Sequence, residues 1–248
     1  MIGQARETFS APEHRETDDD RPRLECGVFG VYDVPDASAV AALGLHALQH
    51  RGQEACGIAS FDGNRFHTER HMGHVGDAFA GPDLIDRLPG THAIGHTRYS
   101  TAGGSFIRNV QPMFADLQAG GVALAHNGNL TNFLVLREQL VADGAIFQST
   151  SDSEVILHLI ATSRYPTLMD RLVDALRMIE GAYSLICMTP KRMIACRDPL
   201  GIRPLVMGRL GDAIVFASET VALEGTGHMP HFSRRREVLA AITRAALP

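Results

Sequence analysis

Apolar residues recur along the chain in short runs that end at glycines or polar turns, a pattern typical of buried β-strands. The first run begins at Cys26, after which Val28, Phe29 and Val31 stand between glycines. Further runs predict strands over 56–61, 65–71, 93–101, 122–130, 182–189, 193–196 and 213–217. A turn at 62–64 should join two of these strands into a hairpin.

Helical patterns gather in the middle of the chain and after the first strand. They predict helices over 38–49, 131–142 and 167–179, and the polar segment 149–154 opens one more, with Ser151 and Glu154 at the spacing of a capping box. Because strands follow strands and helices follow helices, we expect an α+β fold with largely antiparallel sheets and helices outside them.

The composition is that of a globular chain with no polyanionic partner. It has 248 residues, 45% hydrophobic and 21% charged, enough to bury the core of one domain with tails. The formal net charge of −5 is mild, so neither nucleic acid nor a membrane is expected as a partner. No apolar segment leads the chain and the four cysteines form no Cys-x-x-Cys pair, which favours the cytoplasm.

Histidines do not combine into a metal motif. His46 and His50 would share a helix face, but the residue after His46 is Ala47 and not the glutamate of a zinc protease helix, so we expect no metal site.

Residues 1–25 have almost no apolar side chains and are expected to be disordered, because nothing there offsets the entropy of ordering. The acidic run at 18–20 is interpreted as a solvated charge run and not as a magnesium site. The segment has the composition of a removable leader.

Cys26 is the candidate nucleophile, since it stands at the start of a buried strand. A thiol needs a base, and no histidine lies close in the sequence. If the chain were cut between Glu25 and Cys26, the freed amine, with a pKa near ~8, could accept the proton. The alternative is a buried structural cysteine.

Four other residues have chemistry that suits a small zwitterionic ligand. Arg98 could bind a carboxylate, or form a structural ion pair. Asn127 and Gly128, where the strand over 122–130 is expected to break into a turn, offer two neutral donors for an oxyanion, or an ordinary hairpin turn. Asp152, in the first turn of a helix, could bind an ammonium or only complement the helix dipole.

Six short motifs stand in order within residues 24–225: CGVFG at 26–30, HRGQE at 50–54, GHTRYST at 95–101, HNG at 126–128, SDSE at 151–154 and RDPLGIRPL at 197–205. Together they resemble the glutaminase domain of the amidophosphoribosyltransferase family, which begins purine synthesis. The resemblance implies the N-terminal nucleophile hydrolase fold, a four-layer αββα sandwich, and removal of a leader before Cys26.

The resemblance also implies roles for particular residues. Cys26 would attack the side-chain amide of glutamine, its own amine would pass the proton to ammonia, and water would release glutamate. Arg98 would hold the α-carboxylate of glutamine, and Asp152 its α-ammonium. The oxyanion would be stabilised by Asn127 and the N–H of Gly128.

Two further segments enter through the resemblance. Arg51 would lie in a loop that closes near the site, and we count it among the substrate-binding residues. The segment 197–205 would brace the fold.

The resemblance ends near residue 225. Residues 26–225 would form the glutaminase domain, while the tail 226–248 diverges and no phosphoribosyltransferase signature follows. We therefore expect no phosphoribosyltransferase domain in this chain, and with it neither the magnesium that this half of relatives uses nor an iron–sulfur cluster. L-glutamine is the expected substrate, and the candidate partners are a separate phosphoribosyltransferase or a second copy of the chain.

Two other functions stay open. The chain could be a truncated, inactive fragment or an interaction module. It could also be the glutaminase domain of a glucosamine-6-phosphate synthase-like enzyme, although in that family the nucleophile directly follows the initiator Met, with no leader.

Overall fold

In the computed structural model, residues 26–79, 82–99 and 106–224 are described, so the predicted leader 1–25 and tail 226–248 lie outside the described residues. The first sheet contains β1 (Gly27–Tyr32), β2 (Ala55–Phe61), β3 (Phe66–Met72), β4 (His92–Arg98), β9 (Val206–Leu210) and β10 (Ala213–Ala217). Its spatial order is β3-β2-β4-β1-β10-β9, and every pairing is antiparallel.

The second sheet has four strands, also antiparallel, in the order of the chain. They are β5 (Met113–Leu117), β6 (Gly120–Leu130), β7 (Gly181–Thr189) and β8 (Arg192–Arg197).

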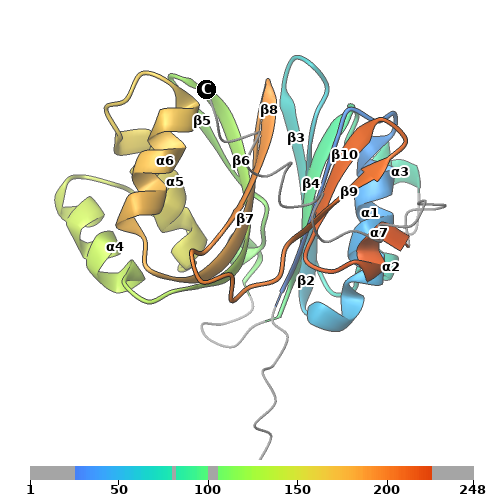
Figure 1. Cartoon of the computed structure of the whole chain (residues 1–248), viewed down its shortest axis with the longest axis horizontal. Coiled ribbons are helices and arrows are strands. Elements are labelled where there is room, and N and C mark those ends of the chain that lie inside the picture. The colour runs from blue at the N-terminus through green and yellow to red at the C-terminus, as the bar shows by residue number, and fades with distance from the viewer. Residues whose placement is uncertain (1–25, 80–81, 100–105, 225–248) are drawn as a thin grey trace, which may run out of the picture.

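Helices cover the outer face of each sheet (Figure 1). The six-stranded sheet carries α1 (Ala37–Ala47), α2 (Val75–Ala78), α3 (Pro82–Ile85) and α7 (Val221–Glu224), and the four-stranded sheet carries α4 (Phe133–Ala142), α5 (Asp152–Thr162) and α6 (Leu168–Met178). Two 3-10 turns, η1 (Gln49–Arg51) and η2 (Ile107–Asn109), complete the elements. Among the described helices, none has the length and apolar character needed to cross a bilayer.

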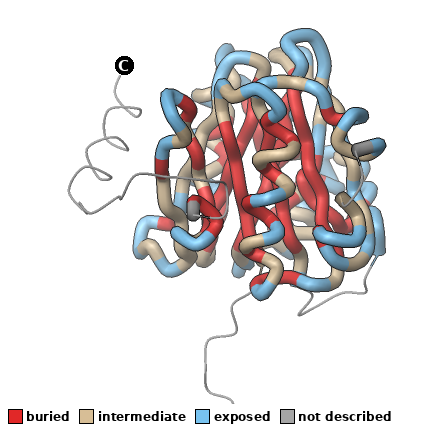
Figure 2. The backbone as a smooth tube through the Cα atoms, turned by 90° about the vertical axis from the view of Figure 1, so that its right-hand side faces the viewer, coloured by how far each residue is buried: buried red, intermediate tan, exposed pale blue. Residues whose placement is uncertain are grey.

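Alternation along the strands builds three apolar layers. In β1, Phe29 and Val31 face the outer helices, whereas Val28 faces the second sheet. The ring of Phe29 lies so close to α1 that a Cβ on Gly44 would come within 2.3 Å of it. A third layer joins the second sheet to α4, α5 and α6 through residues such as Ile156. Figure 2 shows the buried residues concentrated in the central strands, and the predicted αββα sandwich is confirmed.

The Asn127–Gly128 turn expected within 122–130 is wrong. β6 continues through both residues, with Asn127 opposite Ser184 and Gly128 opposite Tyr183 of β7. Gly128 is needed for another reason: its φ is 155°, and a Cβ there would come within 2.2 Å of the carbonyl oxygen of Ala182. The glycine therefore permits close strand packing, not a reversal of the chain.

The other predicted elements are present, with small changes at their ends. The hairpin of β2 and β3 closes as expected, with Asp62 accepting from the N–H groups of Asn64 and Arg65. At α5 the side chain of Ser151 accepts from the Ser153 N–H, while Glu154 binds backbone N–H groups upstream of the helix, so the capping box forms only in part. The sequence has no clear alternation or helical periodicity over β5, β9 and the short helices, so these elements were not predicted.

Two buried histidines connect the sheets. His96 of β4 lies 3.1 Å, through Nε2, from the carbonyl oxygen of His126 in β6, so Nε2 must carry the proton of this hydrogen bond. Burial, assisted by His126 and Arg98, lowers the pKa of His96 to about 3. Burial also lowers the pKa of His126, although Asp152 opposes the shift. Both rings are therefore neutral near pH 7.

We expect stability to fall as these histidines are forced to accept protons. The pKa of His96 is lower in the folded chain than in the unfolded one, so its contribution is fully present above pH ~6.5 and is lost as the pH falls toward 3. When the pH falls from 7 to 5, the free energy of unfolding should decrease by about 2 kcal/mol less in His96→Gln than in the parent chain. Urea denaturation at the two pH values measures this difference.

The control is His46→Gln, because His46 is exposed on α1. This variant should keep the full pH dependence of the parent chain. An unchanged pH dependence in His96→Gln would contradict the assignment of a neutral, buried His96.

Candidate active site

Cys26 lies directly before β1, between the ends of neighbouring strands. Gly27 pairs with Thr97 of β4, so Cys26 stands beside the next residue of that strand, Arg98. The thiol Sγ is 3.7 Å from the carbonyl oxygen of Tyr99. The φ angle of Cys26 is 56°, a region that residues with a side chain occupy rarely and at a cost. Surrounding contacts must hold the residue in this conformation.

The other cysteines are unsuited to nucleophilic chemistry. Burial raises the pKa of Cys56, Cys187 and Cys196 each to about 12, so their thiols stay protonated near neutral pH. Cys26 is partly exposed. Of the four cysteines in the sequence, Cys26 is the one that the fold presents at a strand end.

Arg98 is tied to the segment that leads into α5. Its Nη1 donates to the carbonyl oxygen of Asn109, at 2.8 Å. The side chain of Asn109 in turn donates to Thr150 Oγ1, at 2.9 Å, and accepts from the Thr150 N–H, at 3.0 Å. Asn109 is 2% exposed. It therefore fixes the distance between the cation of Arg98 and the start of α5, where Asp152 lies.

Asp152 is anchored to the end of β6. Its Oδ2 accepts from the N–H of Leu130 at 3.0 Å. Its Oδ1 lies 3.7 Å from His126 Nδ1, whose nearer partner is Ser153 Oγ at 2.9 Å. The side chain keeps 17% of its exposure. Because this carboxylate is still partly open to solvent, a cationic ligand could reach it.

Asn127 is the most unusual polar residue of the site. It is fully buried, yet neither Nδ2 nor Oδ1 has a hydrogen-bond partner among the described residues. An unpaired buried amide costs about 1–3 kcal/mol. The cost is explained if the amide has a partner only when a ligand is bound.

Gly128 follows Asn127 in β6, where the packing against β7 excludes any side chain. Its N–H as an oxyanion donor stays a prediction.

Arg51 differs from the loop residue that was expected. The side chain is fully buried in η1, and its Nε donates to the carbonyl oxygen of Cys26 at 2.6 Å. Its Nη1 donates to Glu219 Oε1. A direct contact between Arg51 and glutamine stays a prediction, whereas its contact with the backbone of Cys26 is observed.

The segment 197–205 is held by one carboxylate. Asp198 accepts from the N–H groups of Tyr183, Leu200, Ile202 and Arg203. Burial opposes the ionisation of Asp198, but these hydrogen bonds outweigh it, so the pKa of Asp198 lies below its usual range. The geometry agrees with the bracing role expected for this segment.

Two polar residues of the site escaped the sequence analysis. Asn109 lies in a stretch without periodicity, so no local signal marked it. Glu219 lies two residues after the strand predicted over 213–217, and no motif or periodicity marked it. The one usable signal was its position close to the end of a buried strand, where polar residues often serve a site.

The part of the chain that the structure describes contains no group of three or more His, Cys, Asp or Glu side chains arranged to hold a metal ion. His50 instead pairs with Glu219, at 3.0 Å.

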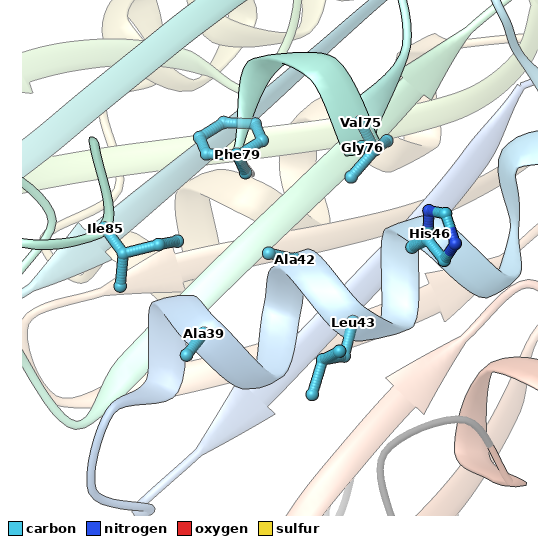
Figure 3. Close-up of a pocket in the computed structure, with 8 residues that line it drawn as sticks. All are labelled: Ala39, Ala42, Leu43, His46, Val75, Gly76, Phe79 and Ile85. Atoms are coloured by element: carbon cyan, nitrogen blue, oxygen red, sulfur yellow. The ribbon is translucent and has the colours of Figure 1, made fainter. Parts of the chain in front are cut away.

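A hollow of about 360 Å³ lies elsewhere, on the outer face of α1 (Figure 3). Its walls come from α1 and the segment around α2 and α3: Ala39, Ala42, Leu43, His46, Val75, Gly76, Phe79 and Ile85. These side chains are mostly hydrocarbon, and none of the candidate site residues borders the hollow. It therefore offers no charges that would match an amino acid.

Known proteins are similar to this chain in sequence and in fold. A family model described as a glutamine amidotransferase domain matches residues 96–225. The amidophosphoribosyltransferase of Rhizobium etli is 59% identical over 221 residues, which are 89% of this chain and 45% of that protein. The Bacillus subtilis enzyme of the same name is 46% identical over 204 residues, 82% of this chain and 43% of that protein.

The solved structures agree. The glutamine phosphoribosylpyrophosphate amidotransferase from B. subtilis, complexed with ADP and GMP, superposes with a TM-score of 0.76 at 43% identity, covering 82% of this chain and 44% of that one. The chain thus spans less than half the length of the curated relatives cited here.

Because the other three thiols are held protonated, iodoacetamide at pH 7.5 should label Cys26 alone. A thiol with a pKa about 12 reacts at least about 1,000-fold more slowly than one near the ordinary value. Peptide mass spectrometry after brief labelling is the measurement. Cys26→Ser should take up no label, and equal labelling of Cys187 would contradict the geometry.

Proposed function

Because this chain belongs to the glutamine amidotransferase domain family, we propose that it hydrolyses L-glutamine to glutamate and ammonia, with Cys26 as nucleophile. The observation that carries the proposal is the buried, unpaired amide of Asn127 in β6. A hydrogen bond from His96 joins β6 to β4 near the end of β4 that lies beside Cys26. A neutral donor without a protein partner suits an oxyanion that exists only during the reaction.

The charges of the site match those of a free amino acid. Arg98 offers a planar guanidinium for the α-carboxylate, and Asp152 offers a carboxylate for the α-ammonium. The link through Asn109 and Thr150 holds these opposite charges at a fixed separation. The site would therefore select a zwitterion and leave the side-chain amide facing the thiol.

The reaction follows from these positions. Sγ of Cys26 attacks the amide carbon of glutamine, and the oxyanion accepts from Asn127 Nδ2 and the Gly128 N–H. The proton from the thiol moves to the α-amine of Cys26 and then to the departing nitrogen, so the C–N bond breaks, ammonia leaves and a thioester remains. Water, deprotonated by the same amine, attacks the thioester and restores the thiol as glutamate departs. None of these steps uses a metal or another cofactor.

This mechanism needs Cys26 to carry a free α-amine, so we propose that the leader is removed at the bond between Glu25 and Cys26. The positive φ of Cys26 supports this proposal, because a residue with no preceding peptide is released from the steric cost of that angle.

The destination of the ammonia is part of the same proposal. The relatives named above are amidophosphoribosyltransferases, and this chain matches less than half of each. We propose that the ammonia serves formation of 5-phosphoribosylamine in purine synthesis, on a phosphoribosyltransferase half or partner. The cytoplasmic location expected from the sequence stays a prediction, since several relatives are named as chloroplastic.

The first test is replacement of the nucleophile. Cys26→Ser should lower glutamate formation from L-glutamine by a factor of at least about 1,000, because a hydroxyl is far less nucleophilic than a thiol at neutral pH. Formation of glutamate is followed by coupled oxidation with glutamate dehydrogenase, and intact mass shows whether the active chain begins at Cys26.

Cys196→Ser is the matched control, since this thiol lies in β8 and stays protonated, and it should keep its activity. The proposed function is wrong if the parent chain, beginning at Cys26, releases no glutamate.

A second test separates transition-state from substrate binding. Asn127→Ala should lower kcat about 100- to 1,000-fold with little change in KM, because the amide acts on the oxyanion. Asp152→Asn keeps an oxygen for the Leu130 N–H but loses the charge, so KM should rise about 10- to 100-fold.

Asn64→Ala and Asp116→Asn serve as controls, because both residues are exposed outside the site, and neither parameter should change. A rise in KM alone for Asn127→Ala would contradict its role as an oxyanion donor.

A further inference from the structure

Glu219 is an acidic residue that the proposed chemistry does not use, and it lies at the end of a series of contacts that leads to Cys26. The first contact is the hydrogen bond from Arg51 Nε to the carbonyl oxygen of Cys26, at 2.6 Å. This bond fixes the plane of the peptide that joins Cys26 to Gly27. The direction of the thiol and of the α-nitrogen depends on that plane.

The guanidinium of Arg51 needs a partner of its own. Its side chain is 1% exposed, and a buried cation is costly unless an anion is close. Glu219 supplies the anion through Oε1 on Arg51 Nη1, while its Oε2 lies 3.0 Å from His50 Nε2. Partial burial opposes ionisation of Glu219, but hydrogen bonds from Arg51 and His50 prevail and lower its pKa.

Glu219 is itself fixed relative to the first strand. The preceding residue, Ser218, donates its N–H to the carbonyl oxygen of Val28 at 2.9 Å, and its Oγ accepts from the Val28 N–H at 2.9 Å. Ser218 therefore extends the pairing of β10 with β1 by one residue beyond the last ladder pair, Phe29 with Ala217. The carboxylate that follows is placed by the same strand that bears Cys26.

From these contacts we infer that Glu219 is a positioning residue for the nucleophile: it holds the Arg51 guanidinium on the carbonyl of Cys26 and so orients the thiol and amine toward the oxyanion donors. The inference rests on the proposed glutaminase activity. It also gives Arg51 a role through Cys26, because a fully buried side chain bonded to that carbonyl is placed to act on the nucleophile.

The two roles of Arg51 make opposite kinetic predictions. If Arg51 contacted glutamine, loss of its partner would raise KM. If it orients Cys26, kcat falls and KM stays, because misplacement of a nucleophile by about 1 Å can cost 100-fold in rate. Glu219→Gln keeps an oxygen acceptor for Arg51, and Glu219→Ala removes it. We therefore expect kcat to fall about 10-fold in the first variant and about 100-fold in the second, with KM for L-glutamine within about twofold of the parent.

The matched control is Glu138→Gln, an exposed glutamate of α4, which should keep both parameters. Figure 1 shows α4 on the other side of the molecule from β10, which precedes Glu219. Intact mass ensures that rates are compared between chains with the same first residue, and thermal unfolding shows that each variant is folded. Should Glu219→Ala fail to fold because the buried Arg51 loses this carboxylate, the double change Arg51→Gln with Glu219→Gln removes both charges together and should show the same fall in kcat.

The outcomes separate the two proposals. A parent chain without glutaminase activity would overturn the proposed function. An active parent chain, with Glu219→Gln and Glu219→Ala equal to it in kcat, or altered in KM alone, would overturn the positioning role and leave the proposed function standing. A graded loss of kcat at constant KM supports the inference.

Discussion

The pairing of β1 between β4 and β10 is the constraint on which the site depends. It sets Cys26 beside Arg98 on one side, and through Ser218 it brings the end of β10 to the other. The hydrogen bond between Val28 and Ser218 joins residues 190 positions apart. Closing so long a loop has an entropic cost that local contacts cannot offset, so Cys26 is positioned only when β1 has paired with β10, late in the sequence.

The candidate site combines charged side chains with neutral ones. In the proposed mechanism, Arg98 and Asp152 would match the two charges of an amino acid, whereas the neutral Asn127 would face an anion that is only transient. The buried His96 and His126 stay neutral: the ring of His96 links the two sheets, and the ring of His126 contacts Ser153 of α5. A cation in the place of Asn127 would bind anions in the ground state as well, and uniform binding of this kind does not accelerate a reaction.

The sequence allowed most of the fold to be predicted, because alternation in strands such as β1 and periodicity in helices such as α6 are local signals. The prediction failed where the preference of a dipeptide differs from what tertiary packing requires. Asn127–Gly128 has the composition of a turn, yet the glycine is required because the backbone of Ala182 in β7 approaches it closely. The candidates Arg98, Asn127 and Asp152 were selected by their chemical type and Arg51 through the family resemblance, and their roles stay predictions. Asn109 and Glu219 were not selected, since their partners lie 41 and 168 residues away and no periodicity connects them.

The pairing of Arg51 with Glu219 also answers an electrostatic problem of the proposed mechanism. A lone buried cation that donates to the carbonyl of Cys26 would lower the affinity of the neighbouring amine for a proton, and that amine is the proposed base. With the Glu219 carboxylate on its far side, the guanidinium keeps its directional N–H groups while its field is largely neutralised. Arg51 can therefore fix the carbonyl of Cys26 without a net positive field that would lower the pKa of the amine proposed as the base.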